Sequence, residues 1–186
     1  YEGRLQPDGS AIEGNWIQTH EDLHGGTDDF HIAGARINDP GWYNHGTAVL
    51  GEIAADSNTF GMTGIAYNVD LGTVSIGSLS TADALLTAIA NSDTGDVFLI
   101  ELHAPGPHYN YQERDDQAGY VCMEYWQDVF DVIVQASALG RIVVEAAGNG
   151  NENFDNSLLY SSLFDPAYRF SGAIIVGATS NAHVPA

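Results

Sequence analysis

Four short apolar segments, separated by stretches with helical spacing, constrain the fold of this chain most strongly. They cover residues 71–76, 96–102, 142–147 and 173–178, and most of their residues are apolar. Strands that are apolar throughout and alternate with helices are typical of a parallel sheet with helices on both faces. In such sheets ligands bind at the carboxyl ends of the strands. Residues that follow these segments are therefore candidates for a functional site.

The helical stretches have recognisable limits. Residues 45–56 carry apolar side chains at helical spacing. A capping box at 80–83 opens a helix that runs to about Asn91. A long helix is expected over 121–139, with Gly140 as its stop. Its expected buried side carries Trp126, Phe130, Ile133 and Leu139. Residues 1–44, rich in Gly, Asp, Asn and His, are expected to be mostly loop.

The charge balance excludes some partners. Five Lys and Arg residues stand against 25 Asp and Glu residues, for a formal net charge of −20. No basic surplus exists to displace counterions from phosphate, so nucleic acid and anionic membranes are excluded as partners. Self-repulsion that keeps the chain soluble, in a salty medium for example, is one explanation of the charge. Binding of a cation such as calcium is the other.

Length and cysteine content bound the class of protein. A chain of 186 residues fits one domain, taken here as residues 1–186. No apolar run is long enough to span a membrane, and the first residues do not look like a signal peptide. A mature secreted protein would have lost such a segment. Cys122 stands alone, so we expect neither a disulfide framework nor a cysteine-based zinc site.

Three segments in order resemble motifs of the subtilisin-like serine peptidase family. Residues 44–51 resemble its histidine motif, 143–150 its oxyanion-hole motif, and 173–178 the strand that comes next in the family. The resemblance implies a three-layer α/β fold, mostly parallel sheet with helices on both faces, incomplete at the C-terminus of the given chain. It also implies an endopeptidase that hydrolyses peptide bonds through an acyl-enzyme.

The resemblance assigns roles to two residues. His45 would open a helix and act as the general base, because a neutral imidazole can take the proton of a serine hydroxyl. Asn149 would donate its side-chain N–H to the oxyanion. Otherwise, His45 is a surface cap or core histidine, and Asn149 is a turn residue that tolerates positive φ.

The third catalytic group is expected near the N-terminus. Residues 11–23 resemble the family's aspartate segment, and matching its end to His20–Leu23 places Glu13 where the family has aspartate. Glutamate can orient imidazole as aspartate does, although its extra methylene demands a shifted backbone. The alternative is an ordinary loop glutamate.

No residue of the chain matches the nucleophile convincingly. The family's Gly-Thr-Ser motif would lie beyond Ala186, and Ser180 only echoes it at the end of a strand. A second hypothesis is therefore a catalytically inactive relative that binds protein or serves as a structural subunit, supported also by Ala48, where the family usually has a second histidine. A third is an acidic calcium-binding module. A half-built cleft would need the missing C-terminal part or a partner chain.

The loop 56–64 resembles the family's calcium loop. The resemblance places the amide oxygen of Asn58 and the carboxylate of Asp22 on the ion. Carbonyls near Asp56, Phe60 and Met62 would complete the set, and oxygen-only ligation suits calcium. The alternative is a turn loop without metal.

The substrate side is expected at the end of the second apolar segment. Leu102, His103 and Ala104 resemble the segment with which a peptide substrate pairs as an added strand. Glu101 and Glu145 lie close to it in the expected sheet; they either line a pocket for a basic substrate residue or are buried carboxyls that share a proton. The remaining histidines, His24, His31 and His108, are interpreted as loop residues. The family also implies an extracellular location.

Overall fold

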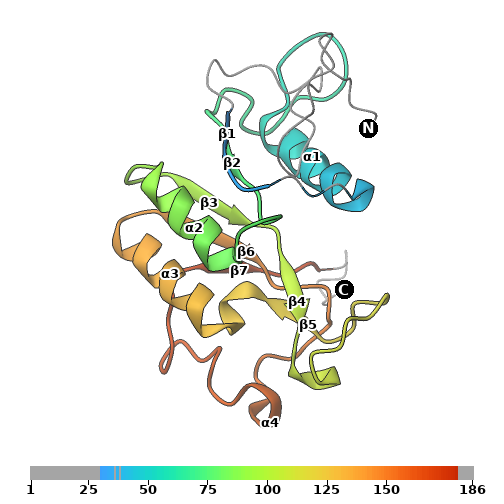
Figure 1. Ribbon diagram of the computed structural model, residues 1–186, viewed down its shortest axis with the longest axis vertical. Coiled ribbons are helices and arrows are strands. Elements are labelled where there is room, and N and C mark those ends of the chain that lie inside the picture. Colours follow the sequence, from blue (N-terminus) through green and yellow to red (C-terminus); the bar gives the residue numbers. More distant parts are fainter. Residues whose placement is uncertain (1–29, 36, 38, 180–186) are drawn as a thin grey trace. The chain divides into compact units, whose positions relative to one another are not determined.

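The computed structural model describes residues 30–35, 37 and 39–179, which fall into two compact units (Figure 1). The first unit extends to Asn91 and the second begins at Ser92. Each unit has its own parallel strands and its own helices. A single domain over 1–186 stays a prediction.

The first unit is built on two parallel strands, β1 (Phe30–Ala33) and β2 (Gly72–Val74). Helix α2 (Thr81–Ala90) packs against both strands. The strand expected over 71–76 is thus confirmed at its centre. The expectation of loop before residue 45 is wrong for β1, whose strand character depends on pairing with a segment about forty residues away.

Helix α1 (Pro40–Ala54) begins earlier than the sequence pattern indicated. Asp39 caps it, because its Oδ1 accepts the backbone N–H of Gly41 at 2.8 Å. Pro40 follows at the first helical position, where its missing N–H costs nothing. The expectation that His45 opens the helix is therefore wrong. His45 lies in the second turn, because the Asp39–Pro40 pair is the stronger start signal.

The capping box of α2 is confirmed. Ser80 Oγ accepts the backbone N–H of Asp83 at 3.1 Å, and its hydroxyl donates to Asp83 Oδ2 at 2.8 Å. Ala82, Ala84, Leu85 and Ile89 are the buried residues of this helix.

The second unit contains a parallel sheet in the order β3-β6-β7. The strands are β3 (Val97–Ile100), β6 (Ile142–Ala146) and β7 (Ile174–Val176). Residue 144 lies between Leu99 and Ile174 in the register. The expected parallel sheet is confirmed, with each strand shorter than its apolar segment.

The long helix expected over 121–139 is wrong in its first third. The chain forms β5 (Tyr120–Cys122), a single 3₁₀ turn η2 (Met123–Tyr125), and only then α3 (Gln127–Ala138). β5 pairs antiparallel with β4 (His103–Pro105), a long-range partner that overrides local helical spacing. Gly140, at φ +83°, stops the helix as expected. The buried residues of α3 are Val129, Val132, Ile133 and Ala136, whereas Leu139 is exposed.

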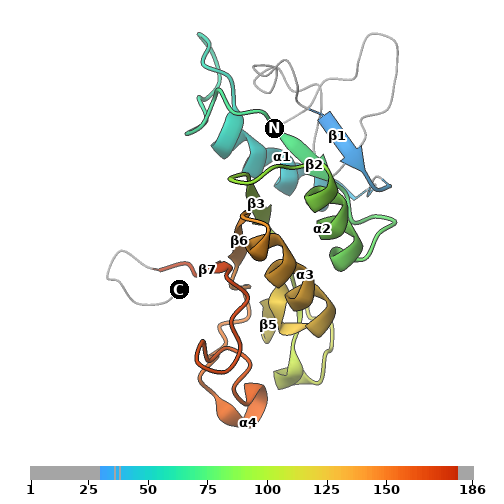
Figure 2. The ribbon, with the colours of Figure 1, turned by 90° about the vertical axis from the view of Figure 1, so that its left-hand side faces the viewer.

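One face of the β3-β6-β7 sheet is covered. Helix α3 packs along that face against β6, as both views show (Figures 1 and 2). Successive side chains of a strand point to opposite faces of a sheet. The register therefore places a group of apolar side chains together on the other face, where they are exposed. This exposed apolar set is Val97, Leu99, Ile142, Ile174 and Val176. Helices were expected on both faces of the sheet. Among the described residues of this unit, a helix covers one face.

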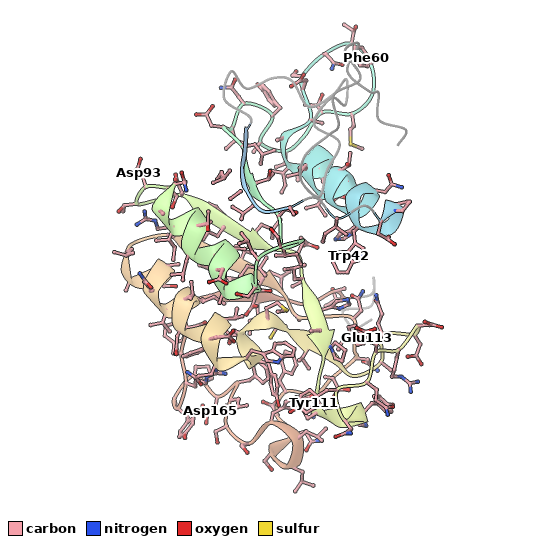
Figure 3. The ribbon with its side chains drawn as sticks, viewed as in Figure 1. Trp42, Phe60, Asp93, Tyr111, Glu113 and Asp165 are labelled. Carbon is pink, nitrogen blue, oxygen red and sulfur yellow. The ribbon has the colours of Figure 1, made fainter. Side chains whose placement is uncertain are left out.

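The 106–119 loop, which joins β4 to β5, contains the short helix η1 (Pro107–Tyr109). Tyr111 and Glu113 lie in this loop (Figure 3). The hydroxyl groups of Tyr111 and Tyr125 are 2.7 Å apart. Tyr125 in turn joins an aromatic cluster beside α4 (Ser157–Tyr160), whose other members are Phe154, Tyr160 and Phe164. This cluster ties the loop to the body of the unit.

No helix within the described part of the chain is long and apolar enough to cross a membrane.

Candidate active site

Asn149 lies in a tight turn just beyond the carboxyl end of β6. Positive φ falls on its neighbours Gly148 (+96°) and Asn151 (+53°), and not on Asn149 itself. The alternative interpretation of Asn149, as a turn residue selected to tolerate positive φ, is therefore wrong. The turn is fastened to the neighbouring hairpin, because Gly150 donates its N–H to the carbonyl of Tyr120 at 3.1 Å and accepts from Gly119 at 3.1 Å.

The structure brings the predicted substrate segment to this turn. The backbone N–H of Asn149 donates to His103 Nδ1 at 3.1 Å. An accepting Nδ1 carries no proton, so the neutral ring has its proton on Nε2. The imidazole also packs edge-on against Tyr120, with 4.8 Å between ring centroids. Leu102 and Ala104 flank His103 and are half-buried. The predicted oxyanion donor and the predicted substrate strand are thus neighbours.

The other predicted catalytic residues lie outside the described part of the second unit, which contains Asn149 and His103. His45 lies on α1 in the first unit, with an exposed side chain. Ala48 is on the same helix and is also exposed. Glu13 lies outside the described residues, and so does Ser180. The roles of His45 and Glu13 stay predictions.

Glu145 points away from solvent, into the layer between the sheet and α3. It is fully buried, and Glu124 of η2 is 5% exposed. Burial first, and then the neighbouring Glu124 carboxyl, raise the pKa of Glu145 to about 8. Glu101 is exposed. This environment favours a buried, protonated Glu145 over a carboxylate that lines a substrate pocket.

Two further groups complete this buried cluster. The Ser171 hydroxyl donates a hydrogen bond to Glu124 Oε2. Cys122 is a free, fully buried thiol. Burial first, then the carboxyls of Glu145 and Glu124, raise the pKa of this thiol. Because the thiolate is the reactive form, Cys122 is a packing residue rather than a nucleophile.

The predicted calcium loop is partly described. Asn58 Oδ1 accepts the backbone N–H of Phe60 at 2.9 Å, which closes a turn within the loop. Phe60 lies at the tip of this loop with an exposed side chain, Met62 is also exposed, and Asp56 is half-buried (Figure 3). An amide oxygen has a second lone pair, so the donor set fits calcium in part. Asp22, its other predicted carboxylate, lies outside the described residues. Calcium binding stays a prediction.

Of the remaining histidines, His108 has a clear structural partner. Its Nδ1 lies 2.7 Å from Glu152 Oε1, and the Tyr160 hydroxyl donates to Glu152 Oε2 at 2.5 Å. His108 lies in the short η1 turn of the 106–119 loop, which agrees with its interpretation as a loop residue, whereas His31 lies in β1, so that interpretation is wrong for His31. His24 lies outside the described residues. Within residues that the structure describes, no three His, Cys, Asp or Glu side chains gather into a metal site.

Sequence reasoning missed two residues of this region. Gln117 accepts a hydrogen bond from Asn149 Nδ2 at 2.8 Å. Glu124 donates its backbone N–H to Glu145 Oε2 at 3.2 Å. Neither contact has a local signal, since each partner is distant in the chain. For Glu124, its position among the apolar residues of 121–126 was the one signal of burial.

Comparison with known proteins decides the family. A family model described as the subtilase family matches residues 12–185. The chain belongs to the subtilase family. Its relatives include alkaline elastase YaB from Bacillus sp. (strain YaB), 32% identical over 184 residues, with 91% of this chain and 39% of the relative covered. Subtilisin DY from Bacillus licheniformis is 29% identical over 154 residues, with 81% of this chain and 48% of the relative covered.

A solved structure agrees with the subtilase fold. The epidermin leader peptide processing serine protease (EpiP) from Staphylococcus aureus matches with a TM-score of 0.58 and 18% identity, over 94% of this chain and 46% of that protein. The subtilisin-like α/β fold predicted from the motifs is confirmed. The chain spans less than half the length of these relatives.

Proposed function

We propose that this chain supplies the general base and the oxyanion donor of a subtilisin-like serine endopeptidase. The observation that carries the proposal is the turn after β6. There Asn149 is held against the hairpin that contains His103, in a chain of the subtilase family. The nucleophilic serine belongs, in this proposal, to sequence outside the given residues. The substrate is a peptide or protein.

In the proposed mechanism each residue has one task. His45 takes the proton of the serine as it attacks the scissile carbonyl, and Glu13 orients the imidazole. Asn149 donates its side-chain N–H to the oxygen on which negative charge develops. The 102–104 segment positions the peptide by adding it as a strand. β4 already pairs with β5 along one edge, so the substrate would use the other.

A serine-directed fluorophosphonate tests this proposal on the full natural protein. We expect covalent labelling that is lost after heat denaturation and strongly reduced in His45→Ala, because an unassisted serine is a weak nucleophile. Absence of labelling in a natively folded protein, judged by circular dichroism, would overturn the proposal.

A catalytically inactive subtilase that binds protein or serves as a structural subunit is the second candidate. Ala48 favours it, because the family usually has a second histidine there, and so does glutamate at position 13. The fluorophosphonate experiment separates the two candidates, since a folded but unlabelled protein fits only this one.

We also propose a structural calcium ion bound by the loop 56–64. Asn58 and backbone carbonyls near Asp56, Phe60 and Met62 would hold it together with Asp22. The ion would fix the loop after α1 without taking part in the reaction. An acidic calcium-binding module without peptidase activity would share this site, and the labelling experiment distinguishes it from the enzyme. An extracellular location rests on the family resemblance and is tested by fractionating the culture medium.

A further inference from the structure

The side-chain amide of Asn149 is held from one side by the 106–119 loop. Asn149 Nδ2 donates to Gln117 Oε1 at 2.8 Å. A primary amide has two N–H groups, so this bond engages one and leaves the second for another acceptor. The terminal torsion of an asparagine side chain is otherwise broad. Because the amide is planar, the bond to Gln117 fixes the direction of the second N–H.

The backbone of Asn149 and its neighbour Gly150 is also fixed against the β4–β5 hairpin. A Cβ placed on Gly150 would lie 2.2 Å from the backbone N and O of Tyr120. The turn therefore approaches Tyr120 more closely than any side chain would allow. With the bond from Asn149 N–H to His103 Nδ1, both the main chain and the side chain of Asn149 are anchored by the hairpin.

Gln117 is itself preorganised. Its φ is +55°, in the left-handed region. Its N–H donates to the carbonyl of Arg114 at 3.0 Å, and its carbonyl accepts from Tyr120 N at 3.1 Å. Two bonds from the Arg114 guanidinium to Asp116, at 2.8 and 2.6 Å, brace the same turn. The acceptor oxygen is thus carried by a turn whose own hydrogen bonds do not involve the Asn149 side chain.

We propose that Gln117 is a positioning residue that orients the oxyanion donor Asn149. This inference rests on the proposed function. Donors aimed in advance at developing charge are the main source of oxyanion stabilisation. Gln117 would therefore act on the transition state, where the charge exists, and leave binding of the substrate nearly unchanged.

Peptidase kinetics of the full natural protein test the inference. Gln117→Ala should lower kcat about 10-fold with an unchanged KM, a partial loss compared with removal of the donor itself. Gln117→Glu retains an acceptor oxygen and should keep most of the activity. Gln112→Ala, in the same loop with an exposed side chain, is the matched control and should match the wild type. In an Asn149→Ala background, Gln117→Ala should have no further effect.

Three results would overturn the inference. They are an unchanged kcat in Gln117→Ala, an increase in kcat, and an equal loss in the Asn149→Ala background. An increase would mean that Gln117 sequesters the donor rather than aims it.

A second readout does not depend on activity. In a ¹⁵N-labelled protein, we expect hydrogen exchange of the Asn149 side-chain amide to be slow in wild type and Gln117→Glu and fast in Gln117→Ala. If the wild type has no peptidase activity, the proposed function fails. In that case, equal exchange rates in wild type, Gln117→Glu and Gln117→Ala would overturn the positioning role as well. Fast exchange in Gln117→Ala alone would support the positioning role.

Discussion

Glu124 donates its backbone N–H to the side-chain Oε2 of Glu145 at 3.2 Å, so two buried acidic residues meet between the sheet and α3. Glu145 Oε1 is buried and accepts no hydrogen bond from the described residues. Two carboxylates cannot both be charged at low cost in such a place. A proton on Glu145 relieves this cost, and its raised pKa has a measurable consequence.

Stability should depend on this proton. The folded protein keeps it up to a pKa of about 8, whereas the unfolded chain releases it near the ordinary pKa of 4.5. Because the folded state binds more protons between these values, the free energy of unfolding falls as pH rises, by up to about 1.4 kcal/mol per pH unit. Glu145→Gln, which is neutral at every pH, should remove this contribution. Urea unfolding of the full protein between about pH 5 and pH 8 measures it.

Glu113→Gln is the control, because Glu113 is an exposed carboxylate in the 106–119 loop. It should keep the wild-type dependence on pH. A Glu145→Gln protein with that same dependence would show that Glu145 is already charged in the folded state.

Loss of the oxyanion donor should affect the rate rather than binding. Asn149→Ala should lower kcat by about 10² to 10³ with little change in KM, a magnitude taken from subtilisin and not from this protein. Steady-state hydrolysis of a peptide substrate measures both constants. Asn151→Gly is the matched control, since it removes a neighbouring amide at φ +53°, where glycine is readily accommodated. Equal losses in the two variants would argue against a specific role for Asn149.

Crowding at the turn should make Gly150 irreplaceable. A Cβ there would lie 2.2 Å from backbone atoms of Tyr120, which cannot move aside as a flexible side chain would. Gly150→Ala should therefore lower the free energy of unfolding by about 1–3 kcal/mol or more. At Gly177 the nearest atom is 4.0 Å away, so Gly177→Ala should be tolerated. Chemical denaturation compares the two variants, and similar stabilities would contradict the close approach.

Calcium, if bound by the loop 56–64, should stabilise the folded protein. An ion at 100 times its dissociation constant contributes about 2.7 kcal/mol. A chelator should therefore lower the melting temperature of the wild type, and addition of calcium should restore it. Asn58→Ala should respond less, because it lacks one oxygen ligand. An identical melting temperature with and without chelator would remove calcium from this loop.

Structural features that depend on a few neighbouring residues, such as helix limits and short motifs, were predictable from the sequence. Ser80 and Asp83 define the start of α2 through their own hydrogen bonds. Gly140 ends α3 because its positive φ is unfavourable for other residues. Three motifs in order, of which the one around Asn149 is the second, indicated the family and, through it, the α/β fold. Local sterics and local hydrogen bonds set the two helix limits.

Pairing over long distances was decided only by the tertiary structure. Residues 121 and 122 lie in the segment 121–139 that was expected to form one helix, yet together with Tyr120 they form a strand because β4 offers backbone partners. Asn149 meets His103 across 46 residues and Gln117 across 32. Such contacts depend on how whole strands are placed, and no short pattern records that placement. The sequence by itself determined that Asn149 is a candidate oxyanion donor, and the fold decided which residues hold it, because an orienting hydrogen bond requires atoms within about 3 Å.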